Sequence, residues 1–233
     1  MLLIFDLDDT LIYTHQVFVE LTEQFLQQMA ALGFDDDNVY YTLDAFDREA
    51  IEQADAYVPW AFPQAMRKTY EFYCERCYQP LDEEQLAAFE ELGNSFREAD
   101  YPLVDGARLV LDLLAEAGHK LVLLTQGGYD EQKYKVELHN LNEYFAEIIV
   151  VDKKTPAVYQ NIMQRHAFAP SQTVVIGNSL KSEIAPALAV GAAAVLVRVC
   201  QGWDFENIEL TQRVPVVHKL VELLPLFQIA NLE

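Results

Sequence analysis

Two carboxylates stand two positions apart where the first apolar run of the chain ends. Residues 2–5 are all apolar, and Asp6-Leu7-Asp8 follows them directly. Because successive side chains of an extended segment point to opposite sides, Asp6 and Asp8 can face one crevice while Leu7 faces the core. Two carboxylates at close range repel each other, and a divalent cation relieves that repulsion by accepting oxygen ligands. The spacing therefore predicts an acidic site that works with a metal ion.

Such a site suits phosphoryl transfer. A carboxylate whose charge is offset by a metal can attack a phosphoryl group and form an aspartyl-phosphate, which makes Asp6 the candidate nucleophile. Asp8 would protonate the leaving oxygen and later deprotonate water, acting as general acid and then as general base. Thr125 offers a hydroxyl to the phosphate oxygens, and a lysine would hold both nucleophile and phosphate. Lys153 and Lys154 are both candidates for that lysine.

Alternating strands and helices are expected to position these residues. After Tyr101 the pattern predicts strands over 121–124, 148–151, 173–176 and 194–199, and helices over 105–117, 130–138, from 156 and over 180–190. This alternation is typical of a parallel sheet with helices on both faces. Ligands bind beyond the carboxyl ends of such strands, so the residues there should meet. They are Asp6, Asp8 and Thr10, then Thr125, Gln126 and Gly127, then Lys153 and Lys154, and finally Gly177, Asn178, Ser179 and Glu183.

The stretch between the first two strands shows a helical pattern instead. Val17, Leu21, Phe25 and Met29 recur at a four-residue spacing that places them on one helix face. Further helices are expected after a cap at 35–37, over 62–78, and from Asp82 to just before Gly93. We therefore predict a Rossmann-like core of residues 1–13 and 101–233, with an all-helical domain of residues 14–100 inserted after the first strand. A last helix is expected over 217–224.

Composition narrows the function classes. The net charge of −21 argues against a nucleic-acid partner, which requires a basic face. No run is long and apolar enough to span a membrane, and the first residues lack the pattern of a signal peptide. Three cysteines fit a reducing compartment, so a cytoplasmic location is expected. Cys74 and Cys77 match half of a zinc site, but without a second pair we interpret them as small apolar helix residues.

Four motifs in this order resemble those of the haloacid dehalogenase superfamily. They are Asp6-Leu7-Asp8-Asp9-Thr10-Leu11, Leu124-Thr125-Gln126-Gly127, Lys154-Thr155-Pro156 and Gly177-Asn178-Ser179-Leu180-Lys181-Ser182-Glu183. The resemblance covers nearly the whole chain and implies that the inserted helices form a cap, which closes over the site and selects the substrate. It also implies a Mg²⁺ cofactor.

The resemblance assigns roles to matching positions. Asp6 would be the nucleophile and a metal ligand, Asp8 the acid/base and a ligand through its backbone carbonyl, and Asn178 and Glu183 further metal ligands, with Glu183 acting directly or through water. Thr125, Gln126 and Lys154 would contact the substrate phosphate. The Lys-Thr-Pro spacing favours Lys154, although other family patterns permit Lys153. Two positions depart from the family: Asn178 replaces a usual aspartate, and Gln126 a common asparagine.

The expected activity follows from Asp8. Dehalogenases of this family lack an acid there, because a halide leaves without a proton, whereas an alkoxide needs one. We expect a Mg²⁺-dependent phosphatase that acts on a small phosphorylated metabolite, as a monomer or a homodimer. A phosphomutase of the same superfamily and a catalytically silent phosphate- or metal-binding relative stay open. A signalling receiver is disfavoured, because its acceptor aspartate follows a strand in the middle of the domain.

Overall fold

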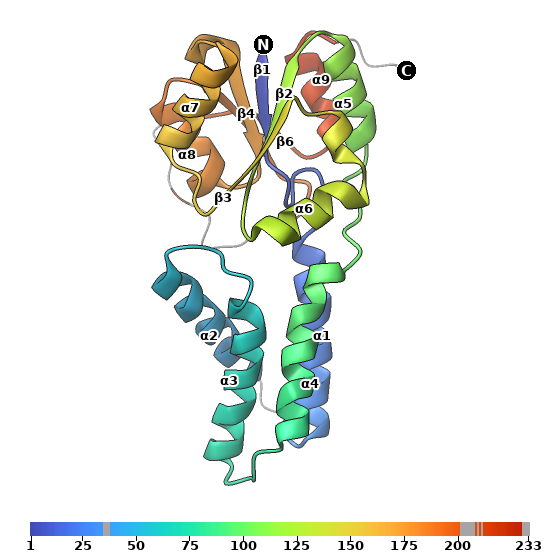
Figure 1. Ribbon diagram of the computed structural model, residues 1–233, viewed down its shortest axis with the longest axis vertical. Coiled ribbons are helices and arrows are strands. Elements are labelled where there is room, and N and C mark those ends of the chain that lie inside the picture. Colours follow the sequence, from blue (N-terminus) through green and yellow to red (C-terminus); the bar gives the residue numbers. More distant parts are fainter. Residues whose placement is uncertain (35–37, 201–207, 209, 211, 230–233) are drawn as a thin grey trace. The chain divides into compact units, whose positions relative to one another are not determined.

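The chain forms two compact units. The structure is a computed structural model of the 233-residue chain and describes residues 1–34, 38–200, 208, 210 and 212–229. The sheet unit comprises Met1–His15 and Tyr101–Glu233, and the helical unit comprises Gln16–Asp100. Figure 1 shows the two units in sequence colours. The sequence prediction placed the first boundary after residue 13, and the structure places it after His15.

The sheet unit is built on parallel strands. Within the described residues the sheet has six strands in the order β3-β2-β1-β4-β5-β6, each paired in parallel with its neighbour. The strands are β1 Leu2–Phe5, β2 Lys120–Gln126, β3 Glu147–Val151, β4 Thr173–Gly177, β5 Ala193–Val197 and β6 Val216–Val217. The predicted α/β fold with a parallel sheet is therefore confirmed. The first strand lies at the centre, so its carboxyl end meets those of β2 and β4.

Helices cover both faces of this sheet. They are α5 Ala107–Glu116, α6 Tyr129–Leu138, α7 Pro156–His166, α8 Ala185–Ala189 and α9 Leu223–Leu226. Figure 1 shows α7 and α8 on one side of the sheet and α5 and α9 on the other. Leu2 and Ile4 belong to a buried cluster with Tyr159 and Ile162 of α7. Because β1 is covered on both sides, its four residues are all buried and read as an unbroken apolar run.

The C-terminal part differs from the prediction. Val217 was expected to begin a helix, but Val216 and Val217 form the edge strand β6. Leu196 N donates to Pro215 O at 2.9 Å, and Arg198 N donates to Val217 O at 2.8 Å. The β-branched valines favour this extended pairing. The helix expected over 180–190 is present, but its first part, Leu180–Ile184, is a π-helix that continues directly into α8.

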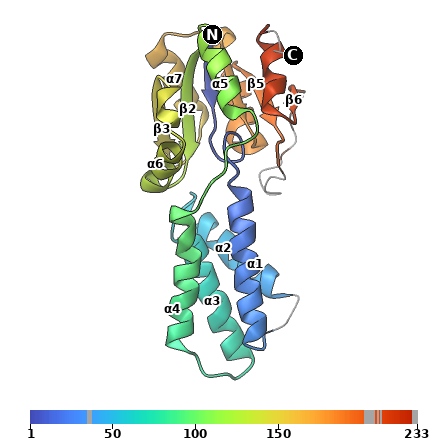
Figure 2. The same ribbon diagram turned by 90° about the vertical axis from the view of Figure 1, so that its right-hand side faces the viewer.

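The helical unit contains α1 His15–Ala31, whose first residue belongs to the sheet unit, α2 Asn38–Ala54, α3 Ala61–Arg76 and α4 Glu83–Asn94 (Figure 2). The buried residues of α1 are the four predicted from the spacing, Val17, Leu21, Phe25 and Met29. Phe25 of α1 lies against Phe89 of α4, with ring centroids 4.7 Å apart. Of the described helices, none is both long enough and apolar enough to cross a membrane.

Two expected helix ends can be compared with the structure. Asp82 caps α4 as predicted, accepting from Glu84 N at 2.9 Å and from Gln85 N at 3.3 Å. Gly93 was expected to stop that helix, but α4 continues to Asn94. A Cβ at position 93 would lie 2.5 Å from Pro63 Cα. Glycine at 93 thus permits a close helix–helix approach. The cap predicted at 35–37 lies outside the described residues.

Candidate active site

The candidate nucleophile is fixed at the end of the central strand. Asp6 N donates to Ile176 O at 2.9 Å, which continues the pairing of β1 with β4. Asp6 is 4% exposed, and Thr10 Oγ1 donates to Asp6 Oδ2 at 3.1 Å. Leu7 O accepts from Leu11 N at 2.8 Å, so the chain turns sharply after Asp6. These contacts hold the Asp6 carboxylate in one orientation.

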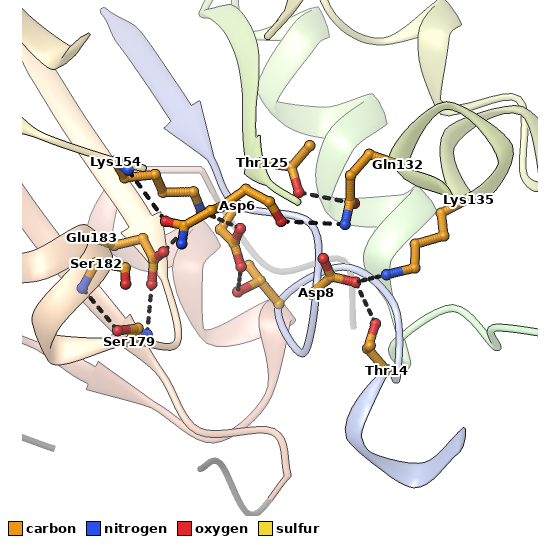
Figure 3. A network of polar contacts seen from close by, with 12 residues as sticks. Asp6, Asp8, Thr14, Thr125, Gln132, Lys135, Lys154, Ser179, Ser182 and Glu183 are labelled. Carbon is orange, nitrogen blue, oxygen red and sulfur yellow. Dashed lines mark hydrogen bonds and ion pairs between the residues drawn. The ribbon is translucent and has the colours of Figure 1, made fainter. Parts of the chain in front are cut away.

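A buried lysine connects Asp6 to a second carboxylate (Figure 3). Lys154, which follows β3, is 6% exposed, and its ammonium contacts Asp6 Oδ1. The same nitrogen lies 2.8 Å from Glu183 Oε1. The side chain of the neighbouring Lys153 is exposed. Of the two lysines considered from the sequence, Lys154 is the one that lies against Asp6.

Glu183 is held on its other side by the backbone that follows β4. Ser179 N donates to Glu183 Oε2 at 2.6 Å, and Ser179 Oγ accepts from Ser182 N at 2.9 Å. Both carboxylate oxygens of Glu183 therefore have a protein partner, Lys154 on one and Ser179 on the other. In this structure Glu183 orients Lys154, a contact that the sequence analysis did not anticipate.

The charges of this cluster stabilise one another. Burial raises the pKa of Asp6, and the Lys154 ammonium opposes that rise. Burial likewise raises the pKa of Glu183 to about 7, again against the attraction of Lys154. Burial alone would lower the pKa of Lys154, but the two carboxylates outweigh it and raise that pKa above its ordinary value. Lys154 is therefore a permanent cation at this site.

Asp8 has other partners than the cluster of Asp6, Lys154 and Glu183. Its Oδ1 accepts from Thr14 Oγ1 at 2.5 Å and lies 2.6 Å from Lys135 Nζ (Figure 3). Burial works against ionisation of Asp8, but the charge and hydrogen bond of Lys135 and the hydroxyl of Thr14 lower its pKa below the usual value. The Asp8 side chain is 25% exposed, so it is open to a reactant.

Residues at the end of β2 form hydrogen bonds with the loop that carries Lys154 and with Gln132 of α6. Thr125 is fully buried, and its hydroxyl donates to Gln132 Oε1 at 3.0 Å. Gln126 Oε1 accepts from Lys154 N at 3.2 Å, so this side chain fixes the loop that carries the lysine. Gln132 Nε2 also donates to Gln126 O at 3.3 Å. Thr125 and Gln126, two of the three residues predicted to contact phosphate, are thus part of one hydrogen-bond network.

The oxygen donors fit a hydrated Mg²⁺. Among the described residues no group of three or more His, Cys, Asp or Glu side chains could hold a metal ion. The resemblance to the family draws instead on the Asp6 carboxylate, the Asp8 carbonyl and the Asn178 amide, with Glu183 directly or through water. In this structure both carboxylate oxygens of Glu183 contact protein partners, Lys154 and Ser179. Mg²⁺ retains several waters and needs only one or two protein carboxylates, so such a set suffices. The backbone carbonyl of Asn178 accepts a hydrogen bond from the Arg198 guanidinium, which fixes this turn.

Helix α6 contributes residues that the sequence analysis missed. Gln132 and Lys135 lie three positions apart, hence on one helix face, and are 4% and 5% exposed. Their signal in the sequence is weak, because a glutamine and a lysine in a charged helix usually face solvent. Only the position of this helix beside the end of β2 shows that they belong to the site.

Gly177→Ala is expected to lower kcat at least about tenfold, because a misplaced catalytic group loses rate steeply. A Cβ at position 177 would lie 2.4 Å from Glu183 Cγ, so the glutamate and with it Lys154 must move. Steady-state kinetics and a thermal melt of the variant test this. Gly33→Ala is the control for an added Cβ, because no atom lies within 4 Å of it, although Gly33, unlike Gly177, has a positive φ of 90°. Equal kinetics of Gly177→Ala and the parent would contradict the expectation.

Comparison with known proteins gives one consistent family. The haloacid dehalogenase-like hydrolase family model matches residues 1–191. A protein of Pyrococcus abyssi named glyceraldehyde 3-phosphate phosphatase is 24% identical over 234 residues, covering 97% of this chain and 93% of its own. A homologue of the same name from Pyrococcus furiosus is 24% identical over 198 residues, covering 82% and 78%.

Solved structures share the fold. A haloacid dehalogenase-like family hydrolase from Xanthomonas campestris has a TM-score of 0.79 at 22% identity, covering 98% of this chain and 94% of that one. The HAD-hydrolase YfnB of Bacillus subtilis, solved bound to magnesium, has a TM-score of 0.67 at 19% identity, covering 97% and 98%. With the family match over residues 1–191, these findings identify the chain as a hydrolase that belongs to the haloacid dehalogenase-like family.

Proposed function

We propose that this hydrolase cleaves small phosphate monoesters, with Mg²⁺ and through an aspartyl-phosphate on Asp6. The observation that carries the proposal is the second carboxylate, Asp8, held two residues beyond the buried nucleophile. An alkoxide leaving group needs a proton, whereas a halide does not, so an acid at this position has a use only in ester cleavage. The phosphatase names of the Pyrococcus homologues support the same reaction.

The reaction divides into two displacements. A carboxylate oxygen of Asp6 attacks phosphorus, the ester P–O bond breaks, and a proton passes from Asp8 to the leaving oxygen. Asp8 must therefore take up a proton before this step, because Lys135 and Thr14 favour its ionised form in the free protein. Water then attacks the phosphorus of the aspartyl-phosphate and gives a proton back to Asp8. The bond between phosphorus and Asp6 breaks, orthophosphate leaves, and both side chains return to their starting states.

Positive charge must be supplied locally in so acidic a chain. The sequence has 37 acidic residues against 16 lysines and arginines, so its overall field repels a phosphate dianion. Lys154 offers a fixed cation beside Asp6, and the Thr125 hydroxyl lies at the end of the neighbouring strand. When bound between the Asp6 carboxylate, the Asp8 carbonyl and Asn178, Mg²⁺ would neutralise further charge on the phosphoryl oxygens.

The test is release of orthophosphate from a panel of phosphate monoesters that includes glyceraldehyde 3-phosphate and p-nitrophenyl phosphate. We expect turnover with Mg²⁺, loss of turnover in EDTA, and recovery when Mg²⁺ is restored. L-2-chloropropionate serves as the comparison substrate and should release no halide. Halide release, isomerisation of a sugar phosphate without free orthophosphate, or no turnover of any ester would each contradict the proposal.

A further inference from the structure

We propose that Lys135 of α6 is a positioning residue, which holds the Asp8 carboxylate in place for proton transfer to the leaving group. The inference rests on the proposed phosphatase function and extends it to a residue outside the four motifs. Lys135 Nζ lies 2.6 Å from Asp8 Oδ1, although 127 positions separate the two residues in the chain. The contact therefore depends on the fold and not on local sequence.

The different burial of the Lys135 and Asp8 side chains indicates the role of each. The Lys135 side chain is 6% exposed, while that of Asp8 is 25% exposed. Lys135 thus lies behind Asp8, away from solvent, and the carboxylate presents its open side to a reactant. A lysine so placed acts through Asp8 and does not itself touch the substrate.

Lys135 is itself fixed on its other side. Its ammonium lies 4.8 Å from the centroid of the Tyr101 ring, and Tyr101 is buried. A cation over an aromatic face is attracted by the ring quadrupole, more strongly where water is excluded. Lys135 is therefore held between the carboxylate of Asp8 and the ring of Tyr101, which restricts where its ammonium can go.

The lysine does not act alone on Asp8. Thr14 Oγ1 donates to the same oxygen, Oδ1, at 2.5 Å. A hydrogen bond from the Gln132 side chain also lowers the pKa of Asp8, and Gln132 lies on the same face of α6 as Lys135. Two charge-assisted contacts on one oxygen fix the rotation of the carboxyl group, because such bonds are short and directional. Without Lys135 the carboxylate would lose its strongest partner.

The test uses two esters that differ in their need for an acid. p-Nitrophenolate leaves readily without a proton, whereas the phenolate of phenyl phosphate needs one. Because kcat/KM reports the steps through departure of the leaving group, a misplaced acid should affect only the second ester. For Lys135→Met we expect kcat/KM to fall at least about tenfold with phenyl phosphate and less than about threefold with p-nitrophenyl phosphate. Lys135→Arg should restore part of the loss.

Two further measurements separate positioning from general damage. In an Asp8→Asn background, Lys135→Met should cause no further loss with phenyl phosphate, because a residue that acts through Asp8 has nothing left to position. Lys133→Met is the matched control on the same helix, since its side chain is 55% exposed and pairs only loosely with Glu137. This control should leave both esters unaffected.

Three results would overturn the inference while leaving the phosphatase function intact. Lys135→Met could lower kcat/KM equally for both esters, or lower it for neither. It could also lower kcat/KM for phenyl phosphate as much in the Asp8→Asn background as in the parent. A crystal structure of Lys135→Met in which the Asp8 carboxylate has not moved would overturn it as well, independently of activity. Failure of the unmodified protein to hydrolyse either ester would instead contradict the proposed function, and the inference with it.

Discussion

Replacing Asp6 by Asn is expected to lower kcat/KM for p-nitrophenyl phosphate by at least about a thousandfold. The amide keeps the size of the side chain and can still accept a hydrogen bond from Thr10, but it has no negative oxygen with which to attack phosphorus. Because Asp6 also faces Lys154, the substitution removes one of the two carboxylates that hold the lysine. Steady-state release of p-nitrophenolate, with Mg²⁺ present, measures the loss.

Asp9→Asn provides the matched control for this experiment. Asp9 has a positive φ of 53°, which asparagine tolerates well. Its Oδ1 accepts from Thr14 N at 2.9 Å and from His15 N at 2.8 Å, and an amide oxygen can do the same. We expect this variant to keep most of the activity. If Asp6→Asn retained activity comparable to Asp9→Asn, the assignment of the nucleophile would be wrong.

Lys154→Met is expected to impair both activity and folding. Its removal leaves Asp6 and Glu183 buried beside each other without a cation, and breaking a buried ion pair by removing one partner costs about 3–5 kcal/mol of stability. Hydrolysis should fall below detection, because the phosphate loses the fixed positive charge beside Asp6. Urea denaturation and p-nitrophenyl phosphate assays measure the two effects, with the exposed Lys153→Met as control.

The stability loss in Lys154→Met should depend on pH. Burial already raises the pKa of Glu183 to about 7 in the presence of Lys154, and without the lysine that pKa can only rise further. The folded variant then binds a proton that the unfolded chain, with an ordinary glutamate pKa near 4.5, has released. The stability of the variant therefore falls as pH rises from about 5 to 8, and it falls further than that of the parent, whose Glu183 has a pKa of about 7. If Lys154→Met lowered the free energy of unfolding by the same amount at pH 5 and at pH 8, the buried cluster of Asp6, Lys154 and Glu183 would be contradicted.

Much of the sheet unit could be predicted from the sequence, because strands covered on both faces leave unbroken apolar runs. Residues 2–5 and 174–176 are of this kind, and both lie in central strands. The helix face of Val17, Leu21, Phe25 and Met29 was equally clear from its spacing. The edge strand β6 was missed because two residues are too few to show any period, and only pairing with β5 makes them extended.

The hydrogen-bond network of the site was harder to predict from the sequence. The positions of Asp6, Asp8 and Lys154 follow from their places after strands, since the carboxyl ends of parallel strands share one edge. The partners Gln132 and Lys135 come from the face of a crossover helix, where a charged residue usually faces solvent. The ion pair between Glu183 and Lys154 depends on the π-helix at Leu180–Ile184, which no sequence pattern predicted.

The central claim is that Asp6 carries the phosphoryl group, and chemical trapping tests it most directly. In Asp8→Asn, p-nitrophenyl phosphate should still phosphorylate the enzyme, because its leaving group needs no proton, while attack by water becomes slow. The intermediate should accumulate with a burst of about one p-nitrophenolate per site. Borohydride reduction of the quenched protein should then convert Asp6, and no other residue, to homoserine in a peptide map. Homoserine at another position, or a burst with residue 6 left as aspartate, would contradict the account.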